Sequence, residues 1–469
     1  MSAILSLTFG NLIAQDLAPA QDTLSLSLEQ CIGVALDMNP TVKVADMDIK
    51  RVDYSKKETL GALLPTVAFG ATYNRMLAKQ VAYMNMDGFG GGASGDESEG
   101  ASSSASGKRQ GIKMGLDNSY SVGFSASLPL IAPQLWASLK LSDSQILQSV
   151  EQARASRLSL VNEVKNAYYT LLLAEDSRNV IKQSYEMAAL THEIYTKQHQ
   201  AGTASDYDVL RTSVAMKNVE PELLQSDIAV KQAKLQLAIL MGISTEIPIK
   251  ASGSLSDYEQ SMYADALGLS RDYSRNTELR QNEIQIRQLS DALRVQKMAW
   301  YPTLTATANY NWTSSSNGSP FRNFLWSPYS VFGLTLNIPL FEGGIRYNRQ
   351  RQASVQVEQV KLQRENIERN VASQVDLSID NIMLNVKQIA SSSESVAQAE
   401  RAHDIMQRSF NIGAASYLDL RDSELALTQA RLAYYQSIYN YLVANSSLEL
   451  LLGDDTKLPN ADSSAITSR

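Results

Sequence analysis

The residue types that carry most enzymatic and metal chemistry are scarce in this chain of 469 residues. It contains three histidines and one cysteine, Cys31. A nucleophilic site needs such groups in a constellation with a base and an orienting partner, and the sequence offers none. No Asp or Glu cluster stands outside the solvated faces of the predicted helices. We therefore predict a protein that catalyses no reaction and uses no cofactor, and a single cysteine excludes an intrachain disulfide framework.

Two of the histidines occupy equivalent positions. His192 lies ten residues before Gly202, and His403 lies ten residues before Gly413. Both fit the apolar spacing of long predicted helices. One interpretation is therefore that they lie in the seam, the line of residues along which two such helices pack, with their hydrogen bonds satisfied there. The alternative is a ring of histidines near the turns that responds to pH or to a metal ion, because imidazole changes charge near neutral pH.

Composition narrows the class of protein. The net charge is −7 and charged residues make up 19% of the chain, so we predict no nucleic-acid partner. No apolar run approaches the roughly 18 residues that a membrane-spanning helix needs. Residues 1–14 are apolar and precede polar residues, as in a secretory signal. We expect residues 1–20 to be a signal-like segment, with a disordered N-terminus as the alternative.

An internal duplication organises the chain. Four segments of the first half reappear in the same order in the second: Leu64–Asn74 with Tyr301–Asn311, Gly123–Leu130 with Gly333–Leu340, Gly202–Ser205 with Gly413–Ser416, and Met241–Gly242 with Leu452–Gly453. The predicted division is a first repeat over 21–242, a connector over 243–258, a second repeat over 259–453 and a tail over 454–469. Each repeat is expected to contain an opening helix, two strands and two long helices.

The expected elements follow from hydrophobic periodicity. Opening helices are predicted over 28–62 and 259–300, strands over about 64–75, 118–130, 302–313 and 329–340, and long helices over about 132–201, 205–242, 345–412 and 416–452. Apolar residues in the long helices alternate spacings of three and four, as at Leu160, Val164, Ala167 and Leu171, which is typical of coiled coils. A helix of such length spans roughly 100 Å, too long for a compact globule.

The predicted strands have one apolar face and one face of small polar residues. Tyr120, Val122 and Phe124 share one face, for example, and only Ser and Gly occupy the other. This pattern fits a transmembrane β-barrel, although a soluble sheet with one wet face is the alternative. Four strands interrupted by long helices cannot close a barrel, and open edges in lipid are prohibitively costly. We therefore predict a homo-oligomer to which each chain contributes four strands.

A loop of Gly, Ser and Ala over residues 84–117 separates the first two strands. Its composition is too polar to bury a core, so we expect it to remain without regular structure. Long loops of such barrels lie on the extracellular side.

The sequence resembles the TolC family of outer-membrane efflux proteins. Leu26–Gln30 and Ala35–Pro40 resemble the family's opening-helix signature, and Pro339–Gly344 and Leu128–Leu130 resemble its strand-to-helix corner. The resemblance implies a mainly α fold with a membrane β-barrel: a homotrimer with a 12-stranded barrel in the outer membrane of a Gram-negative bacterium and a coiled-coil periplasmic tunnel. It implies outer-membrane lipid, a periplasmic adaptor, and an inner-membrane efflux pump or ABC exporter as partners.

The family closes its tunnel where the long helices turn, which corresponds here to Gly202-Thr203 and Gly413-Ala414. Counting from Gly413 places Asp419 and Asp422 at the family's constriction carboxylates. Their i, i+3 spacing puts both on one helix face, and a ring of carboxylates favours cations. The alternative for Asp419 is a capping box that begins at Ser416.

The family also holds these tips shut with a Tyr and an Arg of the second helix pair, bonded to an Asp of the first. The Asp is present as Asp208, but Phe410 stands at the Tyr position and Ala415 at the Arg position. These departures put the family's locks in doubt. Arg211 or Arg421, about one turn away, is a candidate to pair with Asp208 instead.

Two functions remain open from the sequence. The first is the exit duct of an efflux or secretion system, and the second is a coiled-coil surface scaffold or adhesin that transports nothing. A duct should need detergent, run as an oligomer and conduct ions, whereas a scaffold should dissolve in water.

Overall fold

The computed structural model describes residues 24–84, 110–259, 262, 268–317 and 325–455. The predicted signal-like segment 1–20 and most of the tail over 454–469 lie outside these residues. The described chain is mainly helical. It divides into a helical unit (residues 1–53, 144–289 and 355–469) and a sheet unit (residues 54–143 and 290–354).

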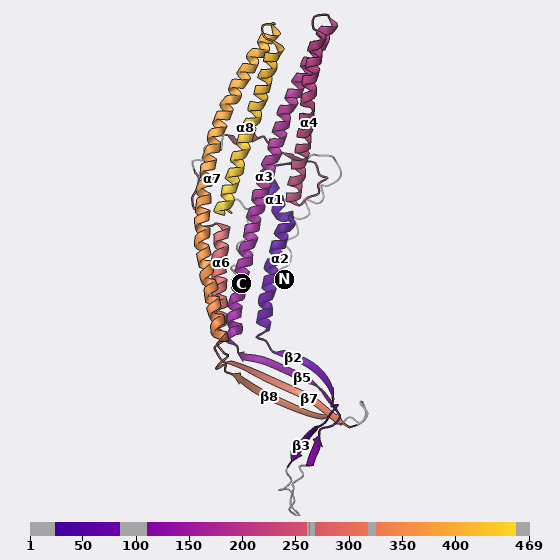
Figure 1. The fold of residues 1–469 in the computed structure, drawn as a ribbon, viewed down its shortest axis with the longest axis vertical. Helices are drawn as coiled ribbons and strands as arrows, with labels where there is room; N and C mark the ends of the chain where they lie inside the picture. Colours follow the sequence, from indigo (N-terminus) through magenta and orange to yellow (C-terminus); the bar gives the residue numbers. More distant parts are fainter. Residues whose placement is uncertain (1–23, 85–109, 260–261, 263–267, 318–324, 456–469) are drawn as a thin grey trace, which may run out of the picture. The chain divides into compact units, whose positions relative to one another are not determined.

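Four long helices dominate the helical unit: α3 (Pro133–Gln200), α4 (Asp206–Met241), α7 (Ile345–Asn411) and α8 (Tyr417–Leu452). They pair as the hairpins α3–α4 and α7–α8 (Figure 1). The 68 residues of α3 correspond to about 100 Å. Leu160, Val164, Ala167 and Leu171 are all buried, which confirms the predicted seam. None of the described helices has both the length and the apolar composition needed to cross a membrane.

A small sheet packs against the middle of α3. Its strands β1 (Leu24–Leu26) and β6 (Ile249–Ala251) pair in parallel, and the short 3₁₀ helix η1 (Leu255–Tyr258) follows. The Tyr168 hydroxyl donates to the carbonyl of Ser252 at 2.8 Å, and Asp176 accepts the amide of Leu255 at 2.9 Å. These bonds hold β6 and η1 against α3, so the predicted connector over 243–258 contains regular structure.

The first predicted opening helix, 28–62, is broken in the structure. It consists of α1 (Leu28–Met38) and α2 (Pro40–Gly61), separated by Asn39 with ψ near 128°. Pro40 disfavours a helical conformation at the preceding residue. The Asn39 side chain stabilises the break, because its amide donates to the carbonyl of Leu240 at 2.7 Å.

The second predicted opening helix, 259–300, is not continuous: residues 259 and 262 are helical, residues 260–261 and 263–267 lie outside the described residues, and the prediction was wrong over 268–276. Its helix is α6 (Thr277–Met298), and residues 268–276 form turns and irregular structure. Polar side chains there bond to nearby backbone, as Asp272 does by accepting the Ser274 amide at 2.9 Å, and such bonds compete with a helix. Asn276 donates to the carbonyl of Leu451 at 2.7 Å, which repeats the contact of Asn39 in the first half.

The sheet unit contains one four-stranded antiparallel sheet (Figure 1). Its order is β2-β5-β7-β8, with β2 (Thr66–Arg75), β5 (Asn118–Ile131), β7 (Thr303–Ser316) and β8 (Ser327–Asn337). Phe124 pairs with Phe69 on one side and Tyr310 on the other, and Ala308 pairs with Phe332. This register puts the predicted apolar faces of all four strands on the same side of the sheet.

The 84–117 segment has more structure than its composition indicates. Strands β3 (Gln80–Met84) and β4 (Gln110–Met114) pair as an antiparallel hairpin, so the expectation of an unstructured loop was wrong at both ends. Residues 85–109 lie outside the described residues. Lys79, just before the hairpin, donates to Asn317 at 3.1 Å and lies 3.0 Å from Asp117.

Candidate functional site at the helix turns

The two turns that the sequence singles out end the hairpins at the same end of the helical unit (Figure 1). Gly202 and Gly413 have φ of +78° and +77°, a left-handed conformation that glycine adopts without steric cost. The amide of the next residue, Thr203 or Ala414, donates to a carbonyl five residues back at 2.9 or 2.8 Å. Both turns are therefore Schellman motifs, which satisfy the last carbonyls of α3 and α7.

A capping box starts each of the following helices. The Asp208 amide donates to Ser205 Oγ at 3.2 Å, and the Asp419 amide donates to Ser416 Oγ at 3.3 Å. Each serine hydroxyl donates back to the carboxylate, at 2.6 and 2.7 Å. These hydroxyl bonds hold the pKa of both carboxyl groups below the usual range, so both are ionised at neutral pH.

Asp419 and Asp422 both lie on the exposed side of α8. Leu420, between them, is buried. Asp422 has no ion pair within the described part of the chain. The Asp419 carboxylate remains exposed although it caps α8. Its role as a cap is therefore compatible with a place in the predicted ring of carboxylates.

An aromatic cluster joins the two hairpins at this end. The ring centroid of Tyr195 on α3 lies 6.4 Å from that of Phe410 on α7 and 5.7 Å from that of Tyr417 on α8. The guanidinium of Arg211 on α4 lies 5.2 Å from the centre of the Tyr417 ring. We call these four residues the tip cluster. Sequence reasoning named Phe410 and Arg211 but not the tyrosines, whose contacts cross between hairpins.

The suggested ion pair of Asp208 with Arg211 or Arg421 does not form within the described chain. Arg211 stacks on Tyr417 instead, and Asp208 caps α4. Arg211 adds only a minor electrostatic contribution to the lowered pKa of Asp208, after the bonds from Ser205. Within the described chain, the tip cluster thus joins the hairpins by aromatic and cation–π contacts and not by an ion pair of Asp208.

The equivalent histidines make equivalent hydrogen bonds. His192 Nδ1 lies 3.1 Å from Thr212 Oγ1, and His403 Nδ1 lies 3.3 Å from Ser423 Oγ. Each hydroxyl also donates to a backbone carbonyl of its own helix, so it accepts from the imidazole, and we assign the proton to Nδ1. Both histidines thus tie their own hairpins together, as the seam interpretation predicts. The described residues contain no group of three or more potential metal ligands.

Paired helices as long as these, joined to a sheet with one apolar face and open edges, are the architecture of a bacterial channel-tunnel. The chain belongs to the outer membrane efflux protein family, whose model matches residues 31–243 and 269–454. It is an outer-membrane protein with a periplasmic tunnel, and members of its family are transport channels.

Two curated relatives and one solved structure illustrate the similarity. The chain is 24% identical over 344 residues to the pyoverdine export outer membrane protein OpmQ of Pseudomonas aeruginosa, covering 72% of this chain and 70% of OpmQ. It is 22% identical over 367 residues to TolC of Escherichia coli, covering 73% and 74%. The CmeC channel of Campylobacter jejuni matches with a TM-score of 0.69 at 16% identity, covering 91% of this chain and 85% of CmeC.

Proposed function

We propose that three copies of this chain form the outer-membrane exit duct of a tripartite efflux or secretion system. Substrate would enter from an inner-membrane pump or ABC exporter through a periplasmic adaptor and leave through the barrel. The observation that carries this proposal is the four-stranded sheet, whose two edges are open and whose strands turn their predicted apolar faces to the same side.

The edge strands explain why one chain is not enough. Every residue of β2 is exposed, and in β8 every residue except Gly333 is exposed. Unpaired backbone groups cannot remain open in lipid, so β8 of one copy would pair with β2 of the next. Three copies would close a 12-stranded barrel whose apolar face contacts lipid.

The helix turns would form the periplasmic aperture. In a trimer, Asp419 and Asp422 would place six carboxylates around one opening, which favours cations over anions. The tip cluster would hold the two hairpins of each chain together while the aperture is closed. Adaptor helices packing against the hairpins would separate them and widen the aperture, as a switch between two packing arrangements.

Single-channel recording in planar bilayers tests this function. Detergent-extracted protein should conduct, and in a salt gradient its reversal potential should indicate cation preference. Asp419→Asn with Asp422→Asn should shift the reversal potential toward zero, and asparagine at 419 keeps a cap acceptor. The control Asp48→Asn removes an exposed carboxylate on α2 and should leave the potential unchanged.

Two results would count against the proposal. An absence of conductance would reject the duct and favour a non-transporting scaffold or adhesin. An unchanged reversal potential in the double variant would reject the carboxylate ring but leave the duct intact.

A further inference from the structure

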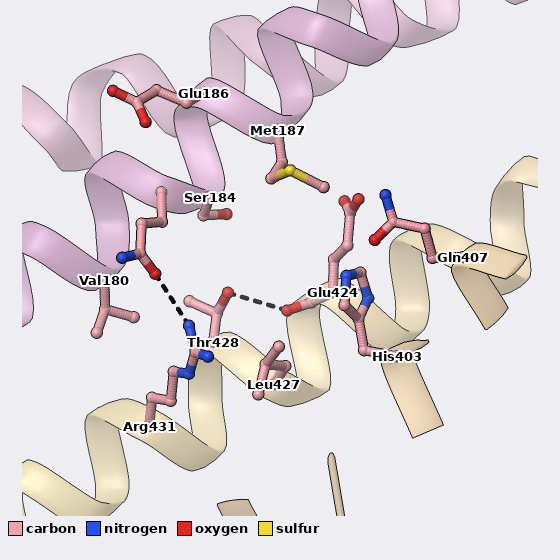
Figure 2. Close-up of a pocket in the computed structure, with 11 residues that line it drawn as sticks. Val180, Ser184, Glu186, Met187, His403, Gln407, Glu424, Leu427, Thr428 and Arg431 are labelled. Carbon is pink, nitrogen blue, oxygen red and sulfur yellow. Dashed lines mark hydrogen bonds between the residues drawn. The ribbon is translucent and has the colours of Figure 1, made fainter. Parts of the chain in front are cut away.

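A cavity of about 350 Å³ separates the two hairpins next to the tip cluster, on the side away from the turns. Figure 2 shows its walls, which come from α3 on one side and from α7 and α8 on the other. Apolar and charged side chains line it together, including Val180, Glu186, Met187, His403, Glu424 and Arg431. The hairpins on either side of this cavity are the ones proposed to separate. A change of charge on a residue that lines it can therefore alter how they pack.

Glu424 on α8 is the unusual member of this lining. Its Oε1 atom is enclosed by protein and has no hydrogen-bond partner among the described residues. A carboxylate oxygen without a donor is costly to bury, and the usual remedy is to take up a proton. In the repeat, Ser213 occupies the equivalent position, so this carboxyl group belongs to the second hairpin alone.

The charged neighbours do not supply the missing donor. Arg431 on α8 donates to Gln183 at 2.9 Å and to Glu400 at 2.8 Å. On α3, the Glu186 carboxylate lies 3.6 Å from the Lys182 ammonium.

The remaining titratable or charged neighbours lie on α7 and on α8 itself. His403 on α7 uses Nδ1 to bond Ser423. Arg421, one turn before Glu424, lowers the pKa of the carboxyl, but burial outweighs it and the net pKa is raised. Packing of the hairpins therefore makes the carboxyl group of Glu424 easier to protonate.

We propose that Glu424 is a proton-binding latch between the hairpins, whose carboxyl group holds a proton more tightly while α8 packs on α3 than when the two separate. The latch rests on the proposed function, because it assumes that these hairpins move apart when the duct opens. Separation admits water to the carboxylate and removes the cost of its charge. Acidification thus holds the hairpins together, and a rise in pH favours opening.

Proton linkage determines in which direction pH shifts the equilibrium between packed and separated hairpins. The packed state binds the proton more tightly than the separated state, so protonation stabilises packing below the raised pKa of Glu424. That stabilisation is lost as pH rises through the raised value. One proton per chain changes the ratio of separated to packed hairpins by at most about tenfold per pH unit.

Thiol labelling measures this separation in the full-length protein. Met187→Cys places a thiol in the cavity wall, and its maleimide labelling rate reports transient separation of the hairpins. The native Cys31 adds little background, because it is fully buried and burial raises its pKa to about 11. Rates are compared with those of Met187→Cys plus Glu424→Gln at the same pH, so that ionisation of the thiol cancels.

The latch makes a prediction about the labelling rate of Met187→Cys divided by that of Met187→Cys plus Glu424→Gln. This ratio should rise severalfold from about pH 4.5 to 7.5. The control replaces Glu424→Gln by Glu394→Gln, a substitution of an exposed residue on α7. The labelling rate of Met187→Cys divided by that of Met187→Cys plus Glu394→Gln should not change with pH. A flat ratio for Glu424→Gln, or one that falls as pH rises, would overturn the latch. Conductance of the same proteins separates the two hypotheses: channels with a flat ratio refute only the latch, whereas loss of all conductance refutes the duct.

Discussion

The tip cluster makes a quantitative prediction for Tyr417→Ala. This substitution removes an edge-to-face contact with Tyr195 and the cation–π contact with Arg211. Aromatic pairs contribute about 0.5–1.5 kcal/mol and exposed cation–π contacts about 0.5–1 kcal/mol. The closed arrangement should therefore lose about 1–2.5 kcal/mol per chain, which raises its opening constant roughly 5- to 70-fold.

Open probability in planar bilayers measures this change. Tyr417→Phe should behave like the parent, because it keeps both ring contacts. Tyr207→Ala is the matched control, since Tyr207 lies on α4 near the same turn but is 69% exposed. If Tyr417→Ala leaves the open probability unchanged, or if Tyr207→Ala raises it equally, the cluster does not hold the tips.

Three further predictions concern stability. Gly453→Ala should lower the melting temperature far more than Gly61→Ala. A Cβ at position 453 would lie 2.1 Å from a backbone oxygen, and the backbone φ of +70° there costs alanine about 1–2 kcal/mol. Equal melting shifts for the two variants would contradict this. Lys165→Met should cost about 3–5 kcal/mol because it removes the ammonium that balances the charge of Glu449 in a largely buried ion pair, and adding Glu449→Leu should restore most of the loss in denaturant titrations. Cys31, fully buried with a pKa raised to about 11, should react with maleimide at neutral pH only after unfolding, and labelling of the folded protein would show that the site opens.

Sequence reasoning succeeded where a pattern is local and periodic. Strand alternation has a period of two residues, so the apolar faces around Phe124 and Phe332 could be assigned before their pairing was known. The seam of α3 followed in the same way. The break at Asn39 was missed because helical periodicity continues across it, although Pro40 carried the signal. Strands β1 and β6 span three residues each, too few for any pattern to appear.

In the candidate site, too, the local features could be predicted from the sequence and the contacts between hairpins could not. Turn glycines and capping boxes act within a few residues, so Gly413 and Ser416 could be recognised from the chain alone. The contact between Tyr195 and Tyr417 depends on how two hairpins meet. Glu424 is one of many acidic residues on long helices, and only the packing of α8 beside α3 reveals its enclosed oxygen.

Closure of the barrel by three chains is the central claim, and cysteine cross-linking between edge strands tests it most directly. Paired cysteines scanned along β2 and β8, in cells carrying the protein in their outer membranes, should form disulfides between copies. We expect covalent dimers and trimers, with the series ending at the trimer because the ring is then closed. A ladder that continues beyond three chains, or chains that remain monomeric at every pair in the scan, would contradict it.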